Sequence, residues 1–212
     1  MTEEEARSWL VDHLNVSRET LERLDAFIAL LREENDVQNL VARSTLETVW
    51  GRHIVDSAQL IPLAAEARSW IDLGTGAGFP GLILAALSSA RVTMVEARPK
   101  RVAFLERAAA VLALPSDTEI LCAKVEAVPA RRFDAISARA FAPLPKLLTL
   151  GSRFSDLGTR WILPKGRGAA SELEAARALW QGRFRVEPSL TDSEAGIIVA
   201  DGVVPRARGK KT

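Results

Sequence analysis

Residues 70–81, with the sequence WIDLGTGAGFPG, restrict the possible folds more than any other stretch of the chain. The first four residues predict a buried strand, and Pro80 suits the first turn of a helix. Between them, glycine at positions 74, 76 and 78 permits positive φ angles and lets the backbone approach a ligand closely. A strand, a glycine turn and a helix in this order are typical of the ligand-binding turn of an α/β sheet.

After residue 70 the chain alternates short β-prone runs with helical stretches, as expected for a parallel sheet covered on both faces. We expect strands at 70–73, 92–95, 119–122, 133–137, 160–163, 184–187 and 197–200, and helices at 81–88, 100–112, 144–150 and 171–180. Since no helix is evident between the last two strands, we expect them to pair antiparallel as an edge hairpin. The sequence therefore predicts an α/β fold with a seven-stranded, mostly parallel sheet.

The first third of the chain predicts helices instead. Apolar residues recur every three or four positions through residues 9–31, Ser17 is placed to cap the second helix, and 35–39 is the expected turn. Ser44 and Glu47 have capping-box spacing, which predicts a further helix carrying Val49 and Trp50. We expect an N-terminal helical extension at 1–66 and a core domain at 67–212.

The glycine turn also suggests its ligand. Gly76, Gly78 and Gly81 fit the pattern G-x-G-x-x-G, and Glu96, 20 residues after Gly76, ends the second strand where a carboxylate can hold two ribose hydroxyls. This pattern alone fits a dinucleotide or S-adenosylmethionine. Asp72 favours S-adenosylmethionine, because a carboxylate there repels a pyrophosphate and stabilises an ammonium and a sulfonium. If Asp72 only orders the turn, both ligands remain open.

The segment after the fourth strand narrows the methyl acceptor. Residues 137–143, SARAFAP, lack the Asn or Asp followed by two prolines that is typical of adenine amino methylation. Carbon-5 pyrimidine methylation needs a cysteine nucleophile, and we expect the only thiol, that of Cys122, in the core. An acceptor that is already nucleophilic and needs positioning rather than a base remains, and guanine N7 is such an atom. Arg139, Phe141 and Lys165 are the residues expected to hold it.

These residues resemble a known family, the bacterial 16S ribosomal RNA guanine-N7 methyltransferases called RsmG or GidB. The similarity covers almost the whole chain and is carried, in order, by residues 39–40, 53–57, 72–81, 100–105, 139–142 and 164–166. The resemblance implies a Rossmann-like class I methyltransferase fold, S-adenosyl-L-methionine as cofactor, and methylation of guanine 527 in 16S ribosomal RNA, free or within the small ribosomal subunit. Gln38 and Val41 depart from the Tyr and Thr common in the family, which concerns RNA contacts more than cofactor binding.

The residue patterns and the resemblance together give the expected site residues. Those expected to bind the cofactor, including the turn residues, are Asp72, Gly74, Gly76, Gly78, Phe79, Glu96, Val125, Glu126 and Arg139. Those expected to act in catalysis are Arg139, Lys165 and His53, and those expected to bind RNA are Arg98, Lys100, Arg101 and Lys165. His53 is a candidate site residue only because of the resemblance, and Asp56, three residues later, shares its helical face. On sequence alone, we would expect both His53 and His13 to be structural or exposed. Arg98, Lys100 and Arg101 equally fit a plain cluster at a helix start.

Composition restricts partners and location. Residues 1–36 contain four arginines and ten acids, whereas residues 160–212 contain ten basic residues and six acids, so a polyanion can meet one face. The terminal Arg206, Arg208, Lys210 and Lys211 fit either an RNA contact or a solvated tail. One cysteine and no long apolar run predict a cytoplasmic protein without metal or membrane contact. A nicotinamide dehydrogenase and a noncatalytic RNA-binding protein of the same fold remain alternatives.

Overall fold

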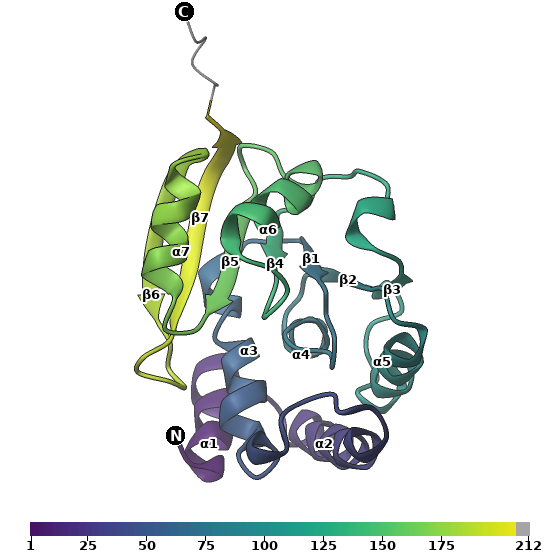
Figure 1. Cartoon of the computed structure of the whole chain (residues 1–212). Helices are drawn as coiled ribbons and strands as arrows, with labels where there is room; N and C mark the ends of the chain where they lie inside the picture. Colours follow the sequence, from purple (N-terminus) through teal and green to yellow (C-terminus); the bar gives the residue numbers. More distant parts are fainter. Residues whose placement is uncertain (207–212) are drawn as a thin grey trace, which may run out of the picture.

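The structure, a computed structural model, describes residues 1–206 and is centred on a seven-stranded sheet (Figure 1). The strands are β1 (Ser69–Leu73), β2 (Arg91–Glu96), β3 (Glu119–Cys122), β4 (Ala135–Ser137), β5 (Arg160–Lys165), β6 (Trp180–Pro188) and β7 (Gly196–Pro205). Their order is β3-β2-β1-β4-β5-β7-β6. The first five strands are parallel, and β7 runs antiparallel to both β5 and β6. The predicted fold class and the terminal hairpin are confirmed.

Helices cover both faces of the sheet. On one face lie α6 (Leu144–Gly151) and α7 (Ala169–Arg177), and on the other lie α4 (Gly81–Leu87) and α5 (Pro99–Val111) (Figure 1). Side chains alternate between faces along a strand, so Trp70 packs with the α4 face whereas Ile71 and Leu73 pack with the α6 face. Such two-sided burial explains why four of the five residues of β1 are buried.

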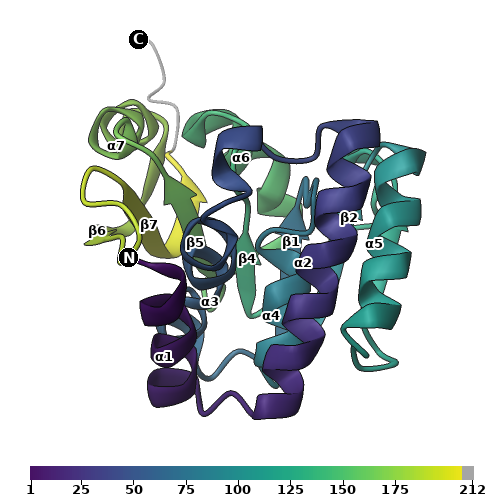
Figure 2. The same cartoon turned by 90° about the horizontal axis from the view of Figure 1, so that it is seen from below.

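The extension adds α1 (Glu3–Leu14) and α2 (Arg18–Gln38) to the α4 face, with α2 alongside α5 (Figure 2). The Ser17 hydroxyl accepts a hydrogen bond from the Thr20 amide at 3.1 Å, which confirms the predicted cap. The predicted turn at 35–39 is wrong, because α2 continues to Gln38. Asn35 is buried in the last turn, where its side chain accepts from the Val41 amide, and only Asn39 adopts the left-handed conformation.

Two short elements join the extension to the sheet. The 3-10 turn η1 (Arg43–Thr45) precedes the π-helix η2 (Trp50–Val55), which continues into α3 (Asp56–Ala58). Neither η1 nor η2 has a side-chain cap, so the capping box predicted at Ser44 is wrong, although Val49 and Trp50 are buried as expected for that helix. Further 3-10 turns are η3 (Ile61–Ala64), η4 (Val125–Ala127) and η5 (Ser152–Phe154).

Two other expectations are corrected. The helix predicted at 171–180 ends at Arg177, since Trp180 already pairs with Pro205 as the first residue of β6. Cys122 is exposed rather than part of the core, because it ends the edge strand β3, which has no buried residue.

One hydrophobic cluster joins residues of α1 and α2 to residues of α4, α5 and the sheet. The division at residue 66 stays a prediction. Within residues 1–206, every helix is too short or too polar to span a bilayer. Arg208, Lys210 and Lys211 lie outside the described residues.

Candidate functional site

The glycine turn lies at the carboxyl end of β1, beside β4, where the strand order reverses. The amides of Gly74 and Thr75 both donate to the carbonyl of Val95, which fixes the turn on β2. Gly74 has φ +71°, and a Cβ there would lie 2.2 Å from the Phe141 ring. The turn therefore requires glycine at this position both for its conformation and for its contact with the segment after β4.

Asp72 lies behind the turn. It is fully buried, its Oδ2 accepts from the Gly81 amide at 3.1 Å, and its Oδ1 accepts from the Ser137 hydroxyl at 2.8 Å. Burial raises the pKa of this carboxyl to about 6. Asp72 shares the sheet face of Trp70, points toward α4 and lines neither hollow described below, so its expected contact with the cofactor stays a prediction. In this arrangement Asp72 ties β1 to β4 and to the start of α4.

A hollow of about 520 Å³, here called the loop hollow, opens next to the turn. It brings together four residues expected to bind the cofactor, namely Gly74, Glu96, Val125 and Glu126. Arg98 and Arg101, expected on an RNA track, also line it, whereas Lys100 does not. Gly76 reaches it only through Glu96, and Gly78 and Phe79 are not among its lining residues.

Glu96 is the most constrained acid of the loop hollow, with 6% of its surface exposed. One carboxylate oxygen accepts from the Gly76 amide at 3.0 Å and the other from the Arg98 amide at 2.8 Å. Arg101 Nη1 lies 3.9 Å away. Because each carboxylate oxygen has two acceptor sites, Glu96 can also accept from two hydroxyls of a ligand.

A second hollow of about 690 Å³, here called the arginine hollow, lies on the other side of the segment after β4. Its lining includes Arg52, His53, Asp56, Arg139, Lys165 and Asp192. The two hollows share Ala140, Phe141 and Ala142. These three residues are therefore the wall between the hollows, and Phe141 presses against Gly74 from that wall.

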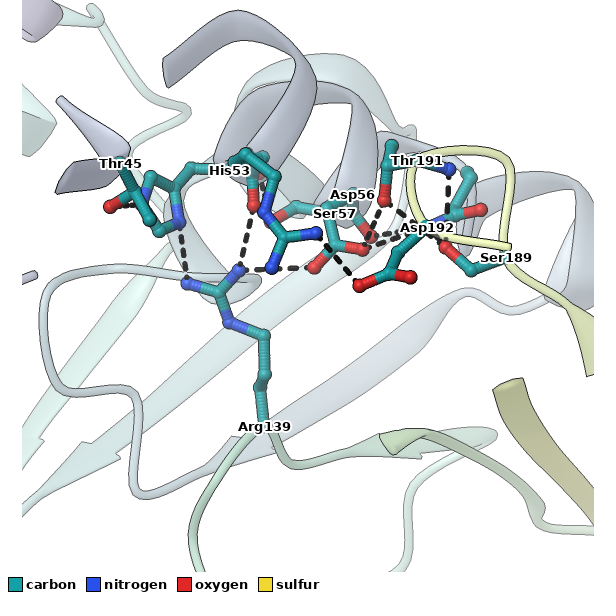
Figure 3. Close-up of polar contacts among 10 residues, drawn as sticks. Thr45, His53, Asp56, Ser57, Arg139, Ser189, Thr191 and Asp192 are labelled. Atoms are coloured by element: carbon teal, nitrogen blue, oxygen red, sulfur yellow. Dashed lines mark hydrogen bonds and ion pairs between the residues drawn. The ribbon is translucent and has the colours of Figure 1, made fainter. Parts of the chain in front are cut away.

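Arg139 and His53 are bonded to each other in the arginine hollow (Figure 3). Arg139 Nη2 donates to His53 Nδ1 at 3.1 Å, and since a guanidinium can only donate, the proton of the ring is on Nε2. That N–H donates to the Thr45 hydroxyl at 2.8 Å, which donates in turn to the carbonyl of Ala42. Burial, with the charges of Arg139 and Arg52, lowers the pKa of His53 to about 3. His53 is therefore neutral at physiological pH and a weak base.

Two further contacts fix this pair. Arg139 Nη1 bonds Asp56 at 3.1 Å, and its guanidinium carbon lies 5.1 Å from the centre of the Phe79 ring. Phe79 stacks on His53 with ring centres 4.9 Å apart. Phe79 is thus a buried support for His53 and Arg139. His13, in contrast, is exposed on α1, as expected.

Lys165 ends β5 and is already paired. Its Nζ donates to the Ala142 carbonyl at 2.9 Å and to Glu172 at 2.8 Å, and only 9% of its side chain is exposed. The same Glu172 oxygen accepts from the Leu144 amide. Lys165 thus holds the wall between the two hollows and also lines the arginine hollow, with one of its three N–H groups outside these bonds. Its expected roles in catalysis and RNA binding stay predictions.

Sequence reasoning missed Arg52, Glu172 and Asp192. Arg52 bonds Asp192 at 3.0 Å across 140 residues of sequence, a pairing that no local spacing signals. In residues 1–206 no group of three or more His, Cys, Asp or Glu side chains is arranged to hold a metal.

Comparisons with solved structures place the fold. A mutant of MtNAS in complex with S-adenosylmethionine aligns over 94% of this chain and 83% of its own, with a TM-score of 0.59 at 17% identity. An O-methyltransferase from Bacillus cereus in complex with SAH aligns over 92% and 96%, with a TM-score of 0.58 at 16% identity. At these identities the likeness concerns the fold alone, a Rossmann-like class I methyltransferase fold.

Comparisons of sequence place the family. The ribosomal RNA small subunit methyltransferase G of Zymomonas mobilis is 52% identical and matches all of both chains, and that of Rhizorhabdus wittichii is 50% identical over all of this chain and 98% of its own. The family model GidB, rRNA small subunit methyltransferase G, matches residues 20–195. The chain therefore belongs to the rRNA small subunit methyltransferase G family.

Proposed function

We propose that this protein transfers the methyl group of S-adenosyl-L-methionine to N7 of guanine 527 in 16S ribosomal RNA. One observation carries the proposal: a ligand-sized hollow at the glycine turn and a second hollow lined by Arg139 are separated only by Ala140, Phe141 and Ala142. Direct transfer needs the methyl carbon and N7 about 3–3.5 Å apart. The donor and the base would therefore meet at the edge of these three residues, where the two hollows border each other. Membership of the family supports the same donor and the same RNA.

The loop hollow fits the cofactor. Its volume lies in the range usual for small-molecule sites, and Glu96 keeps free acceptor positions for ribose hydroxyls. Val125 and Glu126 follow β3, where they would hold the adenine, and Gly74 leaves the turn open to the donor. When bound, the cofactor supplies a methyl group on a positively charged sulfur. Glu96 orients the donor directly, whereas Asp72 acts by fixing the turn.

The arginine hollow fits a guanine. The N7 lone pair attacks a methyl carbon without prior deprotonation, so the low basicity of His53 is no obstacle. Arginine is the side chain best suited to the O6 and N7 acceptors of guanine, and Arg139 points into the hollow from its wall. His53 positions Arg139, and Lys165 holds the wall at Ala142. Catalysis in this proposal is positioning of donor and base.

The basic residues at the start of α5 extend the proposal to the RNA backbone. Arg98 and Arg101 border the loop hollow, and Lys100 is exposed beside them. Their charges are available to phosphates of the loop that presents the guanine. We place the reaction in the cytoplasm, on free 16S RNA or on the small subunit.

The test is a methyl-transfer assay with labelled S-adenosylmethionine on unmodified 16S RNA and on small subunits, followed by mass spectrometry of the product nucleosides. We expect 7-methylguanosine at one position, and its loss from cells that lack the protein. RNA binding without any methylated guanine would favour a noncatalytic RNA-binding protein. Binding of NADH but not of S-adenosylhomocysteine would favour a dehydrogenase.

A further inference from the structure

The turn between β6 and β7, residues 189–195, lies against residues of the extension that are far from it in sequence (Figure 3). The Thr191 hydroxyl donates to Asp56 Oδ1 at 2.9 Å, and Asp192 pairs with Arg52 at 3.0 Å. The Leu190 amide donates to the side chain of Gln59 at 2.8 Å. Asp192 and Ala195 belong to the lining of the arginine hollow. The turn is therefore a rim of that hollow.

These contacts are not needed for the shape of the turn. The Ser189 amide donates to the Ala195 carbonyl, and the Ala195 amide to the Asp192 carbonyl. The Glu194 amide donates to the Asp192 side chain, and the Thr191 amide to the Ser189 hydroxyl. The turn thus closes on itself through its own groups. Its bonds to Asp56, Arg52 and Gln59 fix the position of the turn against the extension.

Asp56 connects the turn to Arg139. Its Oδ2 accepts from Arg139 Nη1 at 3.1 Å, while its Oδ1 accepts from Thr191 at 2.9 Å and from Gln59 Nε2 at 3.1 Å. The terminal torsion of an aspartate is soft, so the orientation of this carboxylate depends on the donors around it. Among the described residues, removal of the Thr191 hydroxyl leaves Gln59 Nε2 as the only donor to Asp56 Oδ1. The carboxylate that pairs with Arg139 is then held less firmly.

We propose that Thr191 is a positioning residue, which acts through Asp56 to hold the Arg139 guanidinium at a set distance from the rim of the arginine hollow. This inference rests on the proposed function, in which Arg139 holds the guanine. Thr191 itself touches neither the base nor the cofactor. An RNA strand that enters the hollow meets both Asp192 on the turn and the guanidinium of Arg139. Asp56 sets the distance between these two groups.

The variant that tests this is Thr191→Val, which removes the hydroxyl at nearly constant shape. We expect kcat/KM for RNA to fall about tenfold, the usual effect of one lost hydrogen bond to a charged group, while affinity for S-adenosylhomocysteine changes less than about twofold. Thr191→Ser keeps the donor and should restore activity. Thr149→Val is the matched control and should act like wild type. It also removes a threonine hydroxyl, which at an exposed position of α6 donates to the Pro145 carbonyl.

A second measurement needs neither RNA nor catalysis. The Nε–H signal of Arg139 in ¹⁵N nuclear magnetic resonance, assigned by its loss in Arg139→Lys, should shift or broaden in Thr191→Val but not in Thr191→Ser or Thr149→Val. An unchanged Arg139 signal, or wild-type RNA kinetics in Thr191→Val, would overturn the inference. So would a parallel loss of cofactor affinity, which indicates a purely structural role. Absence of guanine methylation by the wild type would instead overturn the proposed function and leave the signal interpretable.

Discussion

At the scale of the residue, the partners of His53 decide what it can do. Arg139 donates to one ring nitrogen and Thr45 accepts from the other, so the ring is held in one neutral tautomer. A histidine beside a reacting base is usually considered as a proton acceptor. Here both nitrogens are engaged, and the pKa is lowered to about 3. His53 therefore contributes by orienting Arg139.

The same pKa shift predicts a pH dependence of stability. A base whose pKa falls from 6.5 to about 3 on folding contributes stability that is present above pH 6.5 and lost as the pH falls toward 3. Between about pH 6.5 and 5.5, we expect wild type to lose about 1 kcal/mol more unfolding free energy than His53→Gln. Urea unfolding at both pH values measures the difference. The raised pKa of Asp72 acts in the opposite sense, because the stability it contributes is lost as the pH rises toward 6. Since wild type and His53→Gln both contain Asp72, this contribution cancels in the difference between them.

Glu96 makes the sharpest test of the cofactor site. Glu96→Ala removes the acceptor of the Gly76 and Arg98 amides together with the proposed ribose contacts. We expect the Kd for S-adenosylhomocysteine to rise about 10- to 100-fold, the effect of losing one or two charge-assisted hydrogen bonds. Glu106→Ala, on the exposed side of α5, is the control. Isothermal titration calorimetry with equal affinities for wild type and Glu96→Ala would contradict the assignment.

At the scale of the element, the turn after β1 and the segment after β4 fit each other through Gly74 and Phe141. Gly74→Ala puts a side chain at φ +71° and into the Phe141 ring. We expect thermal unfolding to show a loss of about 1–2 kcal/mol from the left-handed backbone alone, and calorimetry to show weakened S-adenosylhomocysteine binding.

Gly158→Ala is the control for this prediction, because the nearest atom to its Cβ would be 3.4 Å away and its φ is not positive. Adding Phe141→Leu to Gly74→Ala should recover part of the loss by making room. No recovery would show that the contact with Phe141 is not the cause.

The end of β5 is a second element with a testable role. Lys165→Met removes the bonds to Ala142 and Glu172, so we expect RNA methylation to fall about tenfold while S-adenosylhomocysteine affinity stays within about twofold. Glu172→Gln keeps an acceptor for the Leu144 amide and leaves Lys165 on Ala142, and should retain activity within about twofold. Calorimetry and the methyl-transfer assay separate these effects. Equal loss of both functions in Lys165→Met would show that Lys165 supports the loop hollow as much as the arginine hollow.

At the scale of the whole molecule, the extension and the sheet share one core. The Phe27 ring of α2 lies 5.7 Å from Phe79 and 6.4 Å from Phe104, measured between ring centres. Phe79 in turn stacks on His53. The acidic extension is therefore part of what supports the arginine hollow.

Phe27→Ala tests that continuity. We expect about 3–5 kcal/mol lower unfolding free energy in a single transition, because a large buried ring is lost from a core common to both parts. Val37→Ala on the same helix, where the side chain is 75% exposed, should change stability by less than about 0.5 kcal/mol. Chemical denaturation followed by both far-UV circular dichroism and tryptophan fluorescence provides the check. Two separate transitions would show that the extension unfolds on its own.

Local signals were sufficient for most of the elements. The strands, the glycine turn and the terminal hairpin follow from periodicity and turn chemistry, which depend on residues close in sequence. The errors at residues 35–39, at Ser44 and at Trp180 concern element ends, where a buried Asn35 side chain or pairing with Pro205 replaced the expected local signal.

The sequence by itself determined the sheet, the position of the glycine turn and the placing of Glu96 at the end of β2, because each depends on local pattern and on strand order. Only the tertiary structure decided which side chains share a hollow. It joined Asp72 to the Gly81 amide at the start of α4, paired Lys165 with Glu172 and exposed Cys122 on an edge strand. It also brought Asp192 to Arg52 across 140 residues. Such contacts depend on how the layers pack together, and packing between distant segments leaves no spacing in the sequence to detect.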